Sequence, residues 1–239
     1  MARSAGHELE LDLDLDLDLD LDLDLDLDFL PLLRPAPWII VLLLSSFSCG
    51  SPPHVVFAGD SLTYYMQAYW QQTMPVNAQY FIDEGVNGNT SAALLARFAQ
   101  DVISQNAPTV HIMIGTNDIF DDVEYGGIPL ETTEQNIISM IRMSQAAGKR
   151  VILATIPPTM PDYPDPSTAT SVNAHIRVLN DWIRSRSSAN ELVLADYYPV
   201  LVDDGFLNPA YCIDGHVHLN EQGYQQMAPL TLRAIAAAQ

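Results

Sequence analysis

Basic side chains are scarce in this sequence. The 239 residues include 30 aspartates and glutamates but only ten lysines and arginines, and residues 51–239 hold 19 acidic and eight basic side chains. A surface with this excess of negative charge repels nucleic acids and anionic membranes. We therefore expect no nucleic-acid partner.

Cysteines are scarce too, and the apolar run near the N-terminus is short. Cys49 and Cys212 are the two cysteines, and no disulfide is possible if Cys49 is lipidated or removed. An exported chain without disulfides depends on its core, which a chain of this length can build. Residues 38–44 are apolar, but seven residues are too few to span a bilayer.

The first 50 residues differ in composition from the rest. Residues 9–28 alternate leucine with acidic residues that have no basic partners, so we interpret residues 1–28 as a disordered acidic repeat. Arg34, the apolar run and the small residues after it follow the order of a signal peptide, which we predict over residues 29–50. Since a signal peptide normally begins a chain, we interpret the preceding repeat as a start-site artefact.

Cys49 follows Ser-Phe-Ser, which is similar to the cleavage site of a bacterial lipoprotein. Two alternatives stay open: Cys49 carries a lipid that tethers the protein to a membrane, or Cys49 is removed with the signal peptide. In either case we expect residues 51–239 to form one domain that is secreted or held in the cell envelope.

From residue 54 onward, apolar β-branched runs alternate with segments of helical periodicity. The sequence TVHIMIG is apolar on both faces, as a central parallel strand would be. Thr132 and Gln135 are spaced for a capping box at the start of one helix. Five strand and helix units predict a three-layer α/β/α sandwich with a mostly parallel sheet. The predicted strands are residues 54–59, 78–85, 109–115, 150–158 and 191–198.

Polar segments stand at the carboxyl ends of the first three predicted strands, where such sheets carry their functional groups. They read Gly-Asp-Ser, Gly-Val-Asn-Gly-Asn-Thr-Ser and Gly-Thr-Asn-Asp, and Asp-Gly-His-Val-His-Leu-Asn follows far downstream. Each segment alone is typical of an ordinary turn or helix cap. Their conjunction in this order indicates a site.

The residue types in these segments suit nucleophilic catalysis. A serine hydroxyl needs a base, a group that orients the base, and donors for the oxyanion that forms. Ser61 begins a predicted helix, so its Oγ can attack while its N–H donates from the positive end of the helix dipole. The N–H of Gly88 and the neutral amide of Asn117 are candidates for the other two donors.

These four segments resemble the blocks of the SGNH or GDSL hydrolase family: Gly-Asp-Ser, Gly, Gly-x-Asn-Asp and Asp-x-x-His. The resemblance runs from about residue 54 to residue 232. It implies a flavodoxin-like fold with strand order 2-1-3-4-5, and ester hydrolysis through an acyl-enzyme without a metal or cofactor. By position, it implies that Ser61 is the nucleophile, that Ser61, Gly88 and Asn117 form the oxyanion hole, and that His218 is the base.

The last block departs from the family pattern by one residue. Three residues before His218 stands Gly215, and Asp214 lies four residues before His218 and two before His216. Asn220 is a plausible N-cap of the closing helix, which fixes His218 close to a rigid element and favours it over His216. A bulge at Gly215 would accommodate the extra residue. Whether Asp214 then reaches the Nδ1 of His218 stays open at this point.

We therefore predict a serine esterase that acts on small or short-chain acyl esters, including acylated carbohydrates or lipids. One alternative is a lysophospholipase or thioesterase of the same fold. The polar, proline-rich segment at residues 159–171 favours small or carbohydrate-linked acyl groups. The other alternative is a degenerate binding module without catalysis.

Overall fold

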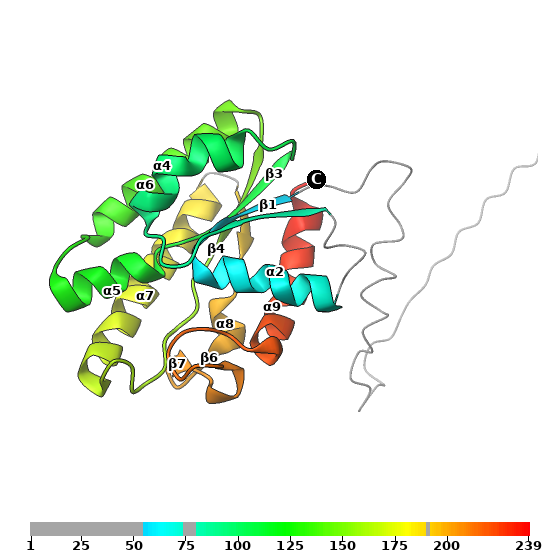
Figure 1. Cartoon of the computed structure of the whole chain (residues 1–239). Coiled ribbons are helices and arrows are strands. Elements are labelled where there is room, and N and C mark those ends of the chain that lie inside the picture. The colour runs from blue at the N-terminus through cyan, green and yellow to red at the C-terminus, as the bar shows by residue number, and fades with distance from the viewer. Residues whose placement is uncertain (1–54, 74–79, 190–191) are drawn as a thin grey trace, which may run out of the picture. The chain divides into compact units, whose positions relative to one another are not determined.

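The computed structural model describes residues 55–73, 80–189 and 192–239. A five-stranded parallel sheet with the order β2-β1-β3-β4-β5 forms the centre of this part of the chain (Figure 1). The predicted α/β fold and its strand order are thus confirmed. The strands are β1 (Val55–Gly59), β2 (Phe81–Gly85), β3 (Thr109–Met113), β4 (Arg150–Ala154) and β5 (Val193–Ala195).

Helices cover both faces of the sheet, as a doubly wound parallel sheet requires. The helices α2 and α9 pack against one another on one face, whereas α4, α6 and α7 cover the other face, where α5 packs against α6 and α7. The larger helices are α2 (Ser61–Thr73), α4 (Ser91–Phe98), α5 (Thr116–Tyr125), α6 (Leu130–Ala146), α7 (Pro166–Ala189) and α9 (Glu221–Ala237). The short elements are η2 (Ala99–Ile103), α8 (Tyr198–Leu201), β6 (Val202–Asp203), β7 (Phe206–Leu207) and η3 (Pro209–Tyr211).

The core lies between the sheet and these two layers. All five residues of β1 and of β3 are buried, because both strands are covered on both faces. The helical stripes expected from the sequence point into this core. The side chains of Phe98, Ile176 and Ile183 are fully buried.

Two helix starts test the capping predictions. Asn220 is the N-cap of α9, and its side chain accepts a hydrogen bond from the N–H of Gly223, which confirms the predicted cap. The capping box at Thr132 and Gln135 is wrong. The helix α6 already begins at Leu130, after Pro129, so Thr132 lies within its first turn and no side chain caps it.

The N-terminal predictions fall outside the described residues. These are the acidic repeat at 1–28, the signal peptide at 29–50 and the lipidation or removal of Cys49. Among the described residues, no helix combines the length and the apolar character needed to cross a membrane.

Candidate active site

The register of the sheet brings the first three polar segments together. Gly59, the last residue of β1, pairs with Gly85 of β2 and with Met113 of β3. The chain therefore leaves three neighbouring strands at the same edge of the sheet. A side chain at position 59 would collide with Thr63 and with the backbone of β3. Only glycine lets β1 turn into α2 at this place.

Ser61 is the first residue of α2 and is half-buried. The preceding Asp60 is buried, and its Oδ1 accepts a hydrogen bond of 2.9 Å from the N–H of Leu62. Asp60 thus fixes the first turn of the helix behind Ser61. The N–H of Ser61 belongs to the first turn, where backbone N–H groups have no partner within the helix.

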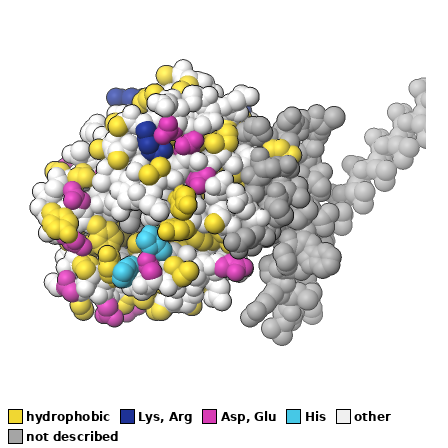
Figure 2. Space-filling model, in the orientation of Figure 1, with side chains coloured by type: hydrophobic (Ala, Val, Ile, Leu, Met, Phe, Trp, Pro, Cys, Tyr) yellow, Lys and Arg dark blue, Asp and Glu magenta, His cyan; other side chains and the backbone are white. Residues whose placement is uncertain are grey.

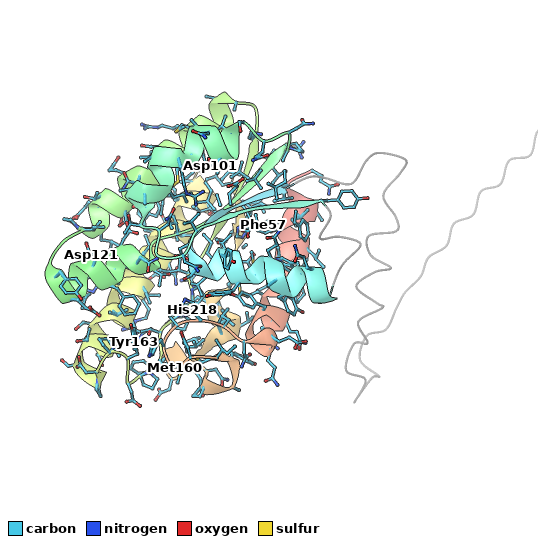
Figure 3. The ribbon with its side chains drawn as sticks, in the orientation of Figure 1. Phe57, Asp101, Asp121, Met160, Tyr163 and His218 are labelled. Carbon is cyan, nitrogen blue, oxygen red and sulfur yellow. The ribbon has the colours of Figure 1, made fainter. Side chains whose placement is uncertain are left out.

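The structure brings His218 and Asp214 to this serine. The Nε2 of His218 lies 2.9 Å from the Oγ of Ser61, and its Nδ1 lies 2.5 Å from the Oδ2 of Asp214. Three side chains from two distant segments therefore form one chain of hydrogen bonds. Figure 3 shows the labelled side chain of His218 below α2, at the end of the helix that Ser61 begins.

A closed loop explains how Asp214 reaches His218 across the extra residue. An antiparallel bridge joins Cys212 to Leu219, and the N–H of Ile213 donates to the carbonyl oxygen of His218. This pairing places Ile213 opposite His218, so Asp214 is the next residue in the loop, where its Oδ1 also accepts hydrogen bonds from the N–H groups of His216 and His218. Gly215 has a φ of +75°, the left-handed conformation that its expected role required. It lies at the turn of this loop and not in a bulged strand.

His216 is held away from Ser61. Its ring stacks on Tyr163 with a centroid distance of 3.8 Å, and its carbonyl oxygen accepts hydrogen bonds from Met160 and Thr159. The Nδ1 of His216 lies 3.8 Å from the Oδ2 of Asp214, beyond hydrogen-bonding distance. Of the two histidines, His218 is therefore the one that links Asp214 to a serine.

The surroundings of Asp214 favour its charged form. Burial raises the pKa of this carboxyl, but the hydrogen bonds from the ring of His218 and from the N–H of His216 outweigh burial and hold the pKa at about 2. Asp214 therefore carries a negative charge at neutral pH. A negative charge beside Nδ1 stabilises the imidazolium that forms when a histidine accepts a proton.

Gly88 and Asn117 lie in the loops that follow β2 and β3. Gly88 is exposed with a φ of +74°, and no heavy atom lies within 4 Å of the position where a Cβ would stand. The Nδ2 of Asn117 donates a hydrogen bond of 2.9 Å to the carbonyl oxygen of Asn89. An amide nitrogen has two hydrogens, so this contact orients Asn117 and leaves a second donor.

A buried network that the sequence reasoning missed joins these two loops. The hydroxyl and the N–H of Ser91 both donate to the carboxylate of Asp118, and Thr133 donates to the same group over 3.1 Å. Asn136 donates to the Oγ of Ser91 over 2.9 Å. Ser91 and Asp118 are each 0% exposed. Their position next to the second and third blocks was the available signal in the sequence.

Ser91 is thus a second serine with a carboxylate partner. It differs from Ser61 because its side chain is fully buried and its hydroxyl is hydrogen-bonded to Asp118 and Asn136 instead of a histidine. Its hydroxyl is already used as both donor and acceptor within the core. This geometry suits a residue that positions the Gly88 and Asn117 loops.

Arg97 is the other residue that the sequence reasoning missed. Its Nη2 donates to the carbonyl oxygens of Glu84 and Gly59, and its Nε donates to the Oδ1 of Asn89. One guanidinium therefore ties the ends of β1 and β2 to the loop that carries Gly88. An arginine at helical spacing in SAALLARF gave no hint of these contacts, which the fold alone creates.

Comparison with known proteins identifies relatives along most of the chain. Residues 45–226 match the GDSL-like lipase/acylhydrolase family. An acetylxylan esterase from Geobacillus stearothermophilus is 26% identical over 212 residues, which cover 78% of this chain and 95% of the esterase. The platelet-activating factor acetylhydrolase IB subunit alpha2 of Rattus norvegicus is 26% identical over 73% of this chain and 72% of that subunit.

A solved structure agrees with these matches. A GDSL-like lipase from Bacteroides thetaiotaomicron superposes with a TM-score of 0.69 at 28% identity, covering 85% of this chain and 98% of the lipase. The family match spans well over half of the chain. The protein therefore belongs to the GDSL-like lipase/acylhydrolase family, and it is a hydrolase of that family.

Proposed function

We propose that the protein is a serine esterase that hydrolyses small or short-chain acyl esters through an acyl-enzyme intermediate. The observation that carries this proposal is the hydrogen-bonded chain from Ser61 through His218 to Asp214. A nucleophile, a base and an orienting carboxylate are the parts that acyl transfer through serine requires.

In the first half of the reaction, the Oγ of Ser61 attacks the carbonyl carbon while the Nε2 of His218 takes its proton. The carbonyl oxygen becomes an oxyanion, which accepts hydrogen bonds from the N–H groups of Ser61 and Gly88 and from the amide of Asn117. The bond to the alcohol oxygen then breaks, and Nε2 gives its proton to that oxygen. The acyl group stays on Ser61.

In the second half, water replaces the alcohol. His218 takes a proton from the water as its oxygen bonds to the acyl carbon. The bond to Oγ breaks, Ser61 regains a proton from Nε2, and the carboxylic acid leaves. Asp214 stays ionised throughout and holds the imidazole in place.

Two relatives support acetyl esters as the substrate class. They are named acetylxylan esterase and platelet-activating factor acetylhydrolase, and both names refer to acetyl groups. Their alcohols differ, since one is a polysaccharide by name. A lysophospholipase or thioesterase activity is the second candidate, and turnover across a series of acyl chain lengths distinguishes it from a short-chain esterase.

Labelling with a fluorophosphonate tests the nucleophile, and p-nitrophenyl acetate tests turnover. We expect the probe to add to the unaltered protein, as measured by intact mass, and not to Ser61→Ala. We expect Ser61→Ala and His218→Ala each to lower kcat by about 10⁴-fold or more.

Ser91→Ala is the matched control for labelling, because it removes the other serine that has a carboxylate partner. This variant should still be labelled. Labelling of Ser61→Ala, or an unaltered protein that neither reacts with the probe nor hydrolyses any acyl ester, would contradict the proposal.

A further inference from the structure

A cavity of about 430 Å³ opens beside His218, on the side of α2. This volume is within the range of small-ligand sites. Its walls are mostly aromatic and aliphatic, with a few polar side chains among them. The lining residues are Tyr65, Ala68, Tyr69, Ile213, Asp214, His218, Leu219, Asn220, Glu221 and Tyr224.

One wall of the cavity is a helical stripe that starts at the proposed nucleophile. Tyr65 and Tyr69 follow Ser61 at intervals of four residues along α2, so all three share one face of the helix. The ring of Tyr65 stands edge-on to the ring of His218, with centroids 5.4 Å apart. The cavity therefore continues the active site along α2.

Tyr224 fixes this part of the site to the helix that carries the nucleophile. Its hydroxyl donates 2.9 Å to the carbonyl oxygen of Leu62, and its ring stacks on Tyr69 with centroids 6.0 Å apart. Tyr224 is 3% exposed, so its position is set by packing. The cavity wall is thus built on rigid elements.

The mouth of the cavity carries unusual apolar exposure. Tyr65 is 41% exposed and Ile213 is 71% exposed, and Tyr64 next to them is 48% exposed. Figure 2 shows hydrophobic side chains gathered around the histidines on this face. Large apolar side chains that gather at the surface mark a binding site, since water contact with them is unfavourable.

The direction of proton transfer decides which part of an ester this cavity faces. The oxyanion points towards Gly88 and Asn117, in the loops after β2 and β3. The alcohol oxygen must instead lie at the Nε2 of His218, which gives it the proton. The alcohol therefore extends along the side of the site to which His218 belongs, and His218 forms part of the cavity wall.

We propose that this cavity binds the leaving alcohol of the ester and selects uncharged alcohols with a ring or an apolar face. This assignment rests on the proposed esterase function and names its substrate class further. The aromatic walls suit the flat or apolar face of an alcohol. The lining includes the carboxylates of Asp214 and Glu221 but no lysine or arginine, so it repels an anionic alcohol.

Filling the cavity tests the assignment. Ala68 is exposed on α2, so Ala68→Trp adds a large side chain without disturbing the core. We expect it to lower the ratio of kcat/KM for 1-naphthyl acetate to kcat/KM for ethyl acetate about tenfold. Ile213→Ala should lower the same ratio about threefold. Because both esters form the same acetyl-enzyme, the change reports on the alcohol alone.

Ala146→Trp is the matched control, since Ala146 is exposed at the end of α6 that leads into β4, away from the site. It should leave the ratio unchanged. A charge comparison adds a second readout: the unaltered protein should hydrolyse phenyl acetate with a kcat/KM at least about tenfold above that for 4-sulfophenyl acetate.

The failures are distinguishable. If the unaltered protein hydrolyses acetates but Ala68→Trp and Ile213→Ala leave the ratio within twofold, the cavity assignment is overturned and the esterase proposal stands. The same holds if these variants change the preference between phenyl octanoate and phenyl acetate instead, since the cavity then takes the acyl chain. If the unaltered protein hydrolyses no acyl ester, both proposals fall.

Discussion

Ser61 and Ser91 are both linked to a carboxylate, and the contrast between them shows what distinguishes the proposed nucleophile from a serine buried in the core. Ser61 stands at the edge of the sheet and contacts Asp214 only through the ring of His218. Ser91 lies in the interior and donates directly to Asp118. The first arrangement has a base that can carry a proton away. In the second, the serine donates to the carboxylate with no histidine between them.

Burial accounts for the rest of the contrast. The hydroxyl of Ser91 donates to one group and accepts from another, Asn136, as a buried polar group requires. Nothing is left over for a substrate. Ser61 is half-buried and faces the loop that carries His218, the proposed base. Ser91 and Asp118 hold together the loops that follow β2 and β3. These loops carry Gly88 and Asn117.

Of the substitutions that test this contrast, Asp214→Asn should have the largest effect on turnover. An amide at position 214 cannot provide the negative charge and favours the wrong tautomer of His218, so we expect kcat to fall by about 10⁴-fold. The measurement is p-nitrophenyl acetate turnover. We also expect the melting temperature to fall at neutral pH, because the lowered pKa of Asp214 means that the folded state stabilises its charged form.

His216→Ala is the control for this variant. The ring of His216 stacks on Tyr163, and its contact with Asp214 runs through the backbone N–H, which alanine keeps. Turnover should stay within about tenfold of the unaltered protein. An Asp214→Asn variant that is no slower than His216→Ala would show that Asp214 does not orient the base.

Removing the hydroxyl of Ser91 should lower stability and not the chemistry of the reaction. Ser91→Ala deprives the buried Asp118 of one donor and leaves the amide of Asn136 without its acceptor, so we expect a loss of about 1–3 kcal/mol in the free energy of unfolding. Urea denaturation measures this change. Ser61→Ala is the comparison, and it should change the unfolding midpoint less than Ser91→Ala does. Equal midpoints would remove the structural role given to Ser91.

Asp60 and Asp214 are the two carboxylates beside Ser61, and Asp60 is buried whereas Asp214 is exposed. Of the substitutions considered, Asp60→Asn should change the measured properties least. Burial raises the pKa of Asp60 to about 7, against the hydrogen bond from Leu62, and the charge of Asp118 raises it further. The folded state thus binds this proton more tightly than the unfolded state. The contribution of Asp60 to the free energy of unfolding is therefore greatest below about pH 4, and it is lost as the pH rises towards 7.

We therefore expect Asp60→Asn to gain stability relative to the unaltered protein between pH 5 and pH 8, by on the order of 1 kcal/mol. The measurement is the urea unfolding midpoint of each protein at pH 5 and at pH 8, and the difference between the two proteins should change between these pH values. Burial also raises the pKa of Asp83, to about 6, and the comparison cancels this group because both proteins contain it. A constant difference between the two proteins would contradict the buried, protonated state of Asp60.

Much of the fold followed from local patterns. The alternation of strands and helices and the cap at Asn220 were predicted, because apolar periodicity and a polar residue before a helix act over short distances. The strand order was an expectation from the family resemblance. The start of α6 was predicted wrongly, because two local signals for a helix start lie close together in the sequence. Thr132 and Gln135 have capping spacing, but Pro129 begins the helix one turn earlier. Local signals compete, and packing chooses between them.

The sequence by itself determined which chemical groups are available and at which strand ends they stand. Gly59, Ser61 and Asn117 are placed by the strands that precede them, and parallel strands end at one edge. The tertiary structure decided which groups touch. The loop closed between Cys212 and Leu219 sets Asp214 against His218, Tyr163 holds His216 aside, and Arg97 and Asp118 join the neighbouring loops. Such contacts depend on distances of a few ångströms between segments far apart in the chain, which no local pattern encodes.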